Sequence, residues 1–174
     1  MTRALRPAAL TLAALCWGML AHAGPGSTGG VEWRGWNEGL QHARASQRPI
    51  IVDVYTDWCG WCRRMDRDVY GKSEITDYLR KRYVTIKLNA EASDAAAYEG
   101  RKTTSQGIAQ RFRVSGYPTT VFLRSTGEHM ANVPGYVPAD KFLLLLRYVA
   151  EGYADRNVPF KDFEKSVQDE AQRP

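Results

Sequence analysis

Cys59 and Cys62, in the segment DWCGWCRRMD (57–66), are the residues best suited to chemistry in this 174-residue sequence. Two cysteines at this spacing can work as a redox dithiol, form an inert structural disulfide, or supply half of a tetrahedral zinc site. A structural disulfide is a weak explanation, because so small a loop restricts the unfolded chain little. The sequence has no second CxxC motif and no histidine directly after Cys62, which disfavours zinc and excludes the haem-attachment motif CxxCH. The pair therefore favours dithiol–disulfide exchange, and we expect no metal.

Asp53 is a third candidate for a chemical role, because it lies in the middle of the apolar, β-branched run IIVDVY (50–55), six residues before Cys59. Such a run is typical of a strand that is buried on both faces. Burial there would favour the neutral carboxyl group and raise its pKa. A proton acceptor of this kind, near the end of the strand, is suited to deprotonating Cys62. The alternative is a buried carboxylate that only satisfies hydrogen bonds.

The segment from Cys59 to Tyr70 is predicted to be a helix that positions the two thiols differently. Cys62, Met65 and Val69 follow one another at i, i+3 and i+7, so this face should pack on the sheet and turn Cys62 inward. Cys59 would lie at the start of the helix and nearer to solvent. The free N–H groups and the positive end of the helix favour a thiolate, and the nearby arginines add to this. We therefore expect Cys59 to attack a disulfide and Cys62 to resolve the mixed disulfide.

The rest of the pattern predicts one α/β domain around these residues. Strands are expected at 50–55 and 84–88, which should be parallel because helices connect them, and at 119–124 and 129–133, which should form a hairpin. Helices are expected at 37–46, 108–114 and 139–153, with another that Ser73 caps and that ends near Arg82. Residues 89–107 are small and polar without a clear pattern. Residues 158–174 should form a short helix or a tail.

The N-terminal residues have the features of a secretory signal peptide over 1–23. Arg3 and Arg6 precede an apolar run at 8–20, and Ala21-His22-Ala23 fits the small-x-small cleavage pattern. The run is shorter than the roughly 20 residues that a membrane-spanning helix needs. A flexible leader is expected over 24–36, followed by the domain at 37–157. An exported chain enters an oxidising compartment, where disulfides persist.

Composition narrows the class of protein further. Hydrophobic residues make up 44% of the chain and charged residues 25%, which indicates a soluble globular protein. The formal net charge is +5, but no basic cluster is interleaved with aromatic residues, so we expect no nucleic-acid partner.

Four motifs in order make the sequence resemble the thioredoxin superfamily over about residues 37–153. They are VDVYTDWCGWC (52–62), IKLNAE (86–91), SGYPTTVFL (115–123) and VPGYVPADKFLLLL (133–146). The resemblance implies an α/β thioredoxin fold, with a central mixed β-sheet flanked by helices. It also implies dithiol–disulfide exchange that needs no cofactor beyond the redox-active disulfide of Cys59 and Cys62.

The resemblance assigns roles to individual residues. It implies Cys59 as the attacking thiol and Cys62 as the resolving thiol, with Asp53 and Lys87 as the buried pair that tunes them. Pro118 would lie beside the disulfide after a cis peptide bond, which proline makes accessible. The residues expected to contact substrate are Trp58, Gly60, Trp61, Tyr117 and Pro118.

Within this superfamily, the helix before RPIIVDVYTDWCGWCRRMD (48–66) makes the chain similar to exported thioredoxin-like proteins, such as the periplasmic C-terminal domain of the thiol:disulfide interchange reductase. This similarity implies a periplasmic disulfide reductase that acts on protein disulfides and receives electrons from a membrane donor. The alternatives are an oxidase or isomerase of the same fold, a metal-binding dithiol chaperone, and a redox-inert interaction module.

Overall fold

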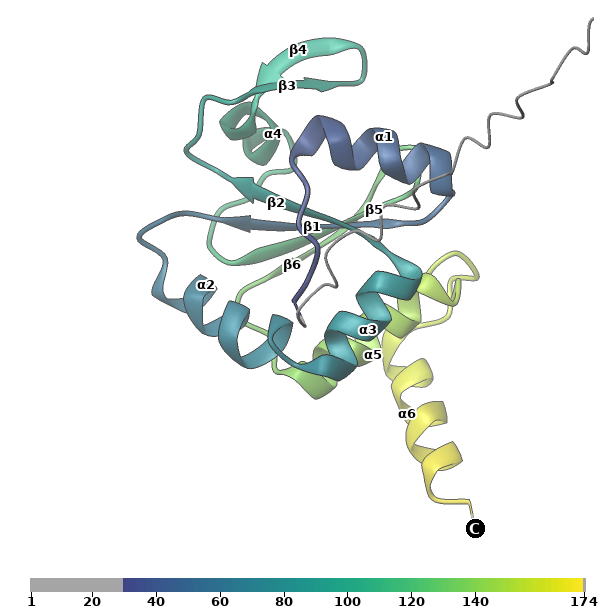
Figure 1. Ribbon diagram of the computed structural model, residues 1–174. Coiled ribbons are helices and arrows are strands. Elements are labelled where there is room, and N and C mark those ends of the chain that lie inside the picture. The colour runs from purple at the N-terminus through teal and green to yellow at the C-terminus, as the bar shows by residue number, and fades with distance from the viewer. Residues whose placement is uncertain (1–29, 174) are drawn as a thin grey trace, which may run out of the picture.

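A four-stranded mixed β-sheet forms the centre of the computed structural model, which describes residues 30–173. The strand order is β2-β1-β5-β6 (Figure 1). β1 (Ile50–Tyr55) runs parallel to β2 (Val84–Asn89) and antiparallel to β5 (Thr119–Leu123), which forms a hairpin with β6 (His129–Pro134). The predicted central mixed sheet, its parallel pair and its hairpin are thereby confirmed. The predicted signal peptide lies outside the described residues.

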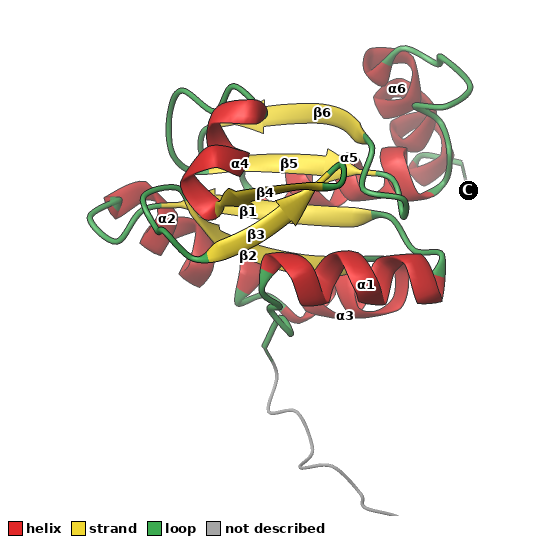
Figure 2. Cartoon of the chain, turned by 90° about the horizontal axis from the view of Figure 1, so that it is seen from above, coloured by secondary structure: helices red, strands yellow, loops and turns green. Residues whose placement is uncertain are grey.

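Helices cover both faces of the sheet (Figures 1 and 2). One face carries α1 (Trp36–Ser46), α4 (Ser105–Arg111) and a separate hairpin of β3 (Ala95–Tyr98) and β4 (Arg101–Thr104). The other face carries α2 (Gly60–Met65), a π-helical turn η1 (Asp66–Tyr70), α3 (Ser73–Arg82) and α5 (Ala139–Ala150), and α6 (Phe160–Ala171) packs against α5. Among the described helices, none is both long enough and apolar enough to cross a membrane.

Each face of the sheet has its own apolar core, because alternate residues of a strand point to opposite faces. Ile50, Val52 and Val54 of β1 lie in the core beneath α1 and α4. Ile51 lies in the core beneath the other helices, so Asp53, two residues later, points to that same side. The strand that leads to the cysteines therefore directs its carboxylate toward α2 and η1.

The N-terminal boundary of the domain differs from the predicted one. α1 begins at Trp36, whose side chain is buried, and not at Asn37. Arg34 forms a parallel bridge with Ile86 along the outer edge of β2. The last residues of the expected leader thus pair with the sheet. At Gly39 the helix comes so close to β2 that a Cβ would collide with the side chain of Ile86.

The β3–β4 hairpin was not predicted, because Ala95–Tyr98 and Arg101–Thr104 have low strand propensity. Side chains of α1 hold the hairpin instead. Trp36 Nε1 donates to the carbonyl of Ala97 at 3.0 Å, and Asn37 both donates to the carbonyl of Ala95 and accepts from the N–H of Ala97. Glu99 and Gly100, at the turn, both have positive φ, as a type I′ hairpin turn requires.

Several predicted helix boundaries also shift. α4 begins at Ser105 and not at 108, because the Thr104 hydroxyl caps it by accepting from the N–H of Gly107. Lys72, rather than the predicted Ser73, occupies the N-cap of α3. The C-terminal segment forms the helix α6, and its Phe163 is buried.

Candidate active site

The cysteine pair lies where β1 ends and α2 begins. Cys59 is the N-cap of α2, so the helix starts one residue later than predicted. Its Sγ atom accepts a hydrogen bond of 3.0 Å from the backbone N–H of Cys62, and the two residues form a disulfide. Cys59 and Cys62 are 4% and 3% exposed, so the expected difference in their access to solvent is wrong for the disulfide form.

Asp53 and Lys87 form an ion pair on the α2 side of the sheet. They are direct partners in the parallel β1–β2 pair, and Lys87 Nζ lies 2.7 Å from Asp53 Oδ2. Burial raises the pKa of Asp53, and the positive charge of Lys87 only partly opposes this. Burial by itself would lower the pKa of Lys87, but its ion pairs with Asp53 and Asp66 outweigh burial and raise it. The pair therefore combines a permanently charged lysine with a carboxyl group that holds its proton more tightly than usual.

Two further residues contact this pair, and neither was predicted from the sequence. Asp66 makes a second ion pair with Lys87, and the ring of Tyr70 lies 5.6 Å from Lys87 Nζ. Both come from the π-helical turn η1, in which residues four apart point in nearly the same direction. The rings of Trp33 and Tyr55 also face Lys87, at 4.8 Å and 5.2 Å from Nζ. A regular helix was predicted over this segment, and the π-helical turn was not.

Exposed aromatic side chains flank the disulfide on two sides. Trp58 and Trp61 are the described large hydrophobic residues that stay exposed, at 65% and 55%. Trp58 Nε1 donates to the carboxylate of Glu91 at 3.0 Å and 3.1 Å, and its ring meets the edge of Tyr117. Trp61 packs beside Tyr136, and the guanidinium group of Arg64 lies over both rings. Four aromatic rings on the surface therefore border the redox pair.

The remaining predicted site residues lie at the same edge of the sheet. Gly60 is the exposed first residue of α2. The Tyr117–Pro118 peptide bond is cis, and Pro118 immediately precedes β5, whose first residue pairs with Val54 near the end of β1. The predicted site residues are thus brought together where β1 ends and β5 begins.

The polar connection after β2 contributes to this edge only at its start. Asn89 Nδ2 donates to Asp57 at 3.2 Å, and Glu91 holds Trp58. The β3–β4 hairpin then crosses the opposite face of the sheet, and Tyr98 donates to the carbonyl of Gly127 in the turn between β5 and β6. That turn lies at the far end of the strands from Cys59.

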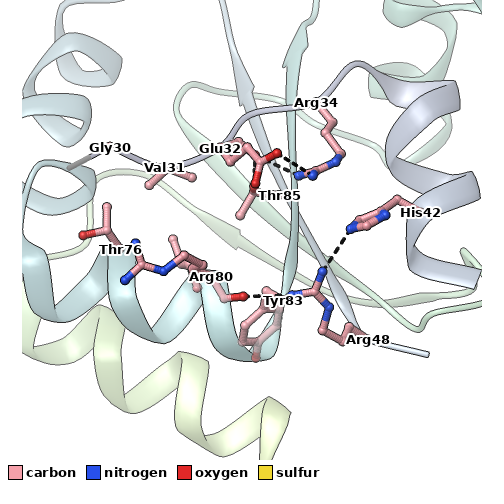
Figure 3. A pocket seen from close by; sticks show the side chains of 11 residues that line it. Gly30, Val31, Glu32, Arg34, His42, Arg48, Thr76, Arg80, Tyr83 and Thr85 are labelled. Atoms are coloured by element: carbon pink, nitrogen blue, oxygen red, sulfur yellow. Dashed lines mark hydrogen bonds and ion pairs between the residues drawn. The ribbon is translucent and has the colours of Figure 1, made fainter. Parts of the chain in front are cut away.

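A pocket of about 350 Å³ lies at the far end of β2, away from the disulfide (Figure 3). Arg48 crosses it and donates to His42 Nε2 at 3.0 Å and to the carbonyl of Arg80 at 2.8 Å. Arg34 and Arg80, at its rim, are ion-paired with Glu32 and Asp77. The polar groups of this pocket therefore satisfy one another, and none of the predicted site residues lines it.

Comparison with known proteins agrees with this geometry. The sequence profile of the thioredoxin-like domain family matches residues 36–150. The disulfide bond reductase DsbH of Chlamydia pneumoniae is 25% identical over 131 residues, which cover 71% of this chain and 78% of that protein. The thiol:disulfide interchange protein DsbD of Ralstonia nicotianae is 28% identical over 112 residues, which cover 64% of this chain but only 17% of that protein.

A solved structure supports the same assignment. The thioredoxin of Thermus thermophilus superimposes with a TM-score of 0.58 at 28% sequence identity, over 71% of this chain and 89% of that chain. The fold is therefore the thioredoxin fold that the sequence resemblance implied. The chain belongs to the thioredoxin-like family of thiol-disulfide oxidoreductases, and its CxxC disulfide joins Cys59 and Cys62.

Proposed function

We propose that this chain is an exported disulfide reductase that transfers electrons from the Cys59/Cys62 dithiol to protein disulfides. The observation that carries the proposal is the position of Cys59 at the N-cap of α2, where its sulfur accepts the backbone N–H of Cys62. A hydrogen-bond donor directed at the sulfur favours the thiolate, which is the nucleophile in exchange. The similarity to DsbH and DsbD supports the same chemistry.

The exchange takes place in two steps. The Cys59 thiolate attacks one sulfur of the client disulfide, a Cys59–client disulfide forms, and the other client sulfur leaves as a thiolate. Cys62 then loses its proton and attacks Cys59 Sγ, which forms the Cys59–Cys62 disulfide and releases the second client sulfur. Two electrons pass from the dithiol to the client. The structure corresponds to the oxidised product of this cycle.

Asp53 is the proposed acceptor of the Cys62 proton. Its carboxylate lies on the α2 side of the sheet and is almost fully buried, and burial raises its pKa, which makes it a stronger base than an exposed carboxylate. Lys87 keeps the carboxylate available by opposing this rise. The ion pair thus holds a carboxylate base inside the protein.

The exposed aromatic rings are the proposed contact surface for clients. Trp58, Trp61 and Tyr117 surround the disulfide, and Gly60 leaves the start of α2 open. Pro118, at the same edge, would bound the place where a client chain approaches. Large, rigid aromatic side chains contribute strongly to protein contacts at little cost in conformational entropy.

The direction of transfer follows from what lies between the cysteines. Gly60 and Trp61 bring no charge and no strong anion-stabilising group. The start of α2 favours the Cys59 thiolate, but nothing between the cysteines adds to this effect, so the dithiol form is stabilised less than in a strong oxidant. In an oxidising periplasm such a dithiol would be oxidised to the disulfide, so a membrane donor of the thiol:disulfide interchange type must reduce it again. The signal-like residues 1–23 support this location.

Trapping a client intermediate tests the proposed cycle. Cys62→Ser should accumulate mixed disulfides through Cys59, because the resolving thiol is missing, and nonreducing electrophoresis with mass spectrometry identifies them. Cys59→Ser is the matched control and should trap nothing. Continued turnover by Cys59→Ser, or the absence of any mixed disulfide in Cys62→Ser, would contradict the assigned roles.

A further inference from the structure

Four buried side-chain oxygen atoms have no role in the exchange cycle described above. They are the side-chain oxygens without a hydrogen-bond partner among the buried groups of residues 30–173, and they belong to Asp53 (Oδ1), Thr56, Tyr70 and Thr120. Buried polar atoms in folded proteins are nearly always paired, so an unpaired group of this kind calls for an explanation. All four come from β1 and the residue after it, from β5, or from the turn η1 that follows α2.

Tyr70 lies on the same face of the sheet as Asp53, and both residues approach Lys87. Asp53 and Thr120 are direct partners in the β1–β5 pair, so their side chains share one face of the sheet. Tyr70 packs on this face, in the same apolar cluster as Ile51. Lys87 Nζ lies 2.7 Å from Asp53 Oδ2 and 5.6 Å from the centre of the Tyr70 ring, which places ring and carboxylate around the same ammonium group.

The packing of Tyr70 leaves its hydroxyl little freedom. The ring meets Trp33 edge to face at 4.9 Å and Phe142 at 5.5 Å, and the whole residue is 3% exposed. Burial, reinforced by the charge of Asp53, holds the pKa of Tyr70 well above its usual value, so the hydroxyl keeps its proton and can only donate to a carboxylate. The same hydroxyl lowers the pKa of Asp53.

We propose that Tyr70 is a positioning residue for the exchange reaction: its hydroxyl donates a hydrogen bond to Asp53 Oδ1 and thereby sets the pH at which this carboxylate accepts a proton. A donor to a carboxylate stabilises the ionised form over the acid. Lys87 occupies one carboxylate oxygen and Tyr70 the other, and together they oppose the effect of burial. The step from Asp53 to the Cys62 proton rests on the proposed function, whereas the hydrogen bond does not.

The other charged or titratable groups that face Asp53 are few. Lys87 faces it from β2, Asp66 from η1 and Tyr55 from β1. The cysteines do not titrate in the disulfide form. Burial raises the pKa of Tyr55, and the carboxylates around Lys87 raise its pKa, so both keep their protons below pH 9. In the oxidised protein, the carboxyl signal of Asp53 must then be distinguished from that of Asp66.

A titration of the oxidised protein tests the hydrogen bond without any exchange activity. The carboxyl ¹³C signals of Asp53 and Asp66 are followed against pH in the wild type and in Tyr70→Phe, which keeps the ring and its packing. Loss of one hydrogen bond to the carboxylate should raise the Asp53 midpoint by about 0.5–1 pH unit. Tyr83→Phe is the matched control, because Tyr83 is equally buried but donates to the carbonyl of Leu146. An unmoved Asp53 midpoint in Tyr70→Phe, or an equal shift in Tyr83→Phe, would overturn the proposal.

A kinetic measurement tests the consequence for exchange. The rate at which Cys62 resolves a preformed mixed disulfide on Cys59 is measured against pH. In Tyr70→Phe the acid limb of this pH–rate profile should move to higher pH by the same amount as the Asp53 midpoint. In the Asp53→Asn background, Tyr70→Phe should not shift the profile. An acid limb that stays in place while the midpoint moves would refute the positioning role. A protein that performs no exchange would refute the proposed function and leave the titration result standing.

Discussion

Replacing Lys87 with methionine should destabilise the oxidised protein by an amount that depends strongly on pH. Lys87 is the partner of a nearly buried carboxylate, with 2.7 Å between Nζ and Oδ2 of Asp53. At that distance, two unit charges attract by about 6 kcal/mol when the effective dielectric constant is about 20. Methionine keeps most of the aliphatic volume between the surrounding rings and removes only the charge. The lost attraction should therefore dominate the change in stability.

The sign of the pH dependence follows from the protonation state of Asp53. Burial raises its pKa and Lys87 opposes the rise, so the pKa is higher still in Lys87→Met. Below the wild-type pKa, both folded proteins hold the neutral acid and the two stabilities are similar. Between the two pKa values only the variant must bind a proton on folding, so its stability relative to the wild type falls by about 1.4 kcal/mol per pH unit. The loss should level off near about 3 kcal/mol, since Lys87 is 20% exposed.

Urea unfolding of the oxidised protein at pH 4, 6 and 8 measures this loss. Asp53→Asn should remove most of its pH dependence, because the buried carboxyl partner of Lys87 is gone and only the more exposed pair with Asp66 remains. Lys141→Met is a suitable control, since Lys141 pairs with Glu164 at the surface and its loss should cost less than about 1 kcal/mol. A loss in Lys87→Met that is equal at pH 4 and pH 8, or that keeps its pH dependence in the Asp53→Asn background, would refute the reasoning.

Three further predictions follow from the same structure. Trp61→Ala should slow exchange with a protein disulfide about 5–30-fold and with oxidised glutathione much less, because only the protein contacts the exposed ring; equal losses in stopped-flow rates would remove Trp61 from the contact surface. Gly39→Ala should lower the free energy of unfolding by about 1–3 kcal/mol through its collision with Ile86, whereas Gly116→Ala, which has open space, should not; equal urea midpoints would show that α1 adjusts freely. Replacing the β3–β4 hairpin with a short linker should leave the exchange rate with oxidised glutathione unchanged, because the hairpin crosses the face of the sheet away from α2; a large loss would show that it supports the active site.

The central elements could be predicted because their sequences carry local signals. IIVDVY and VTIKLN are apolar and rich in β-branched residues, so β1 was predicted at its observed bounds and β2 within one residue. The β3–β4 hairpin could not be predicted, since its strands are held by Trp36 and Asn37, about 60 positions earlier in the chain. Contacts between segments far apart in the chain cannot be recognised from the local sequence pattern.

The residues of the candidate site were likewise predicted where the sequence carries a signal and missed where it carries none. The CxxC spacing and a carboxylate in an apolar strand identified Cys59, Cys62 and Asp53, and the superfamily resemblance added Lys87. Asp66 and Tyr70 approach Lys87 from the π-helical turn η1, for which the sequence DRDVY gives no signal. The burial of Cys59 was also missed, because helix periodicity describes one face of α2 and not the loops around it.

Equilibration of the Cys59/Cys62 pair with glutathione buffers of known potential tests the central claim most directly. The fraction of oxidised protein at each buffer ratio gives the reduction potential of the pair. A disulfide reductase with uncharged residues between its cysteines should have a potential closer to thioredoxin's value of about −270 mV than to the roughly −120 mV of a strong oxidant. A potential near −120 mV would contradict the reductase assignment and favour an oxidase, and a pair that does not exchange with glutathione would contradict the redox function itself.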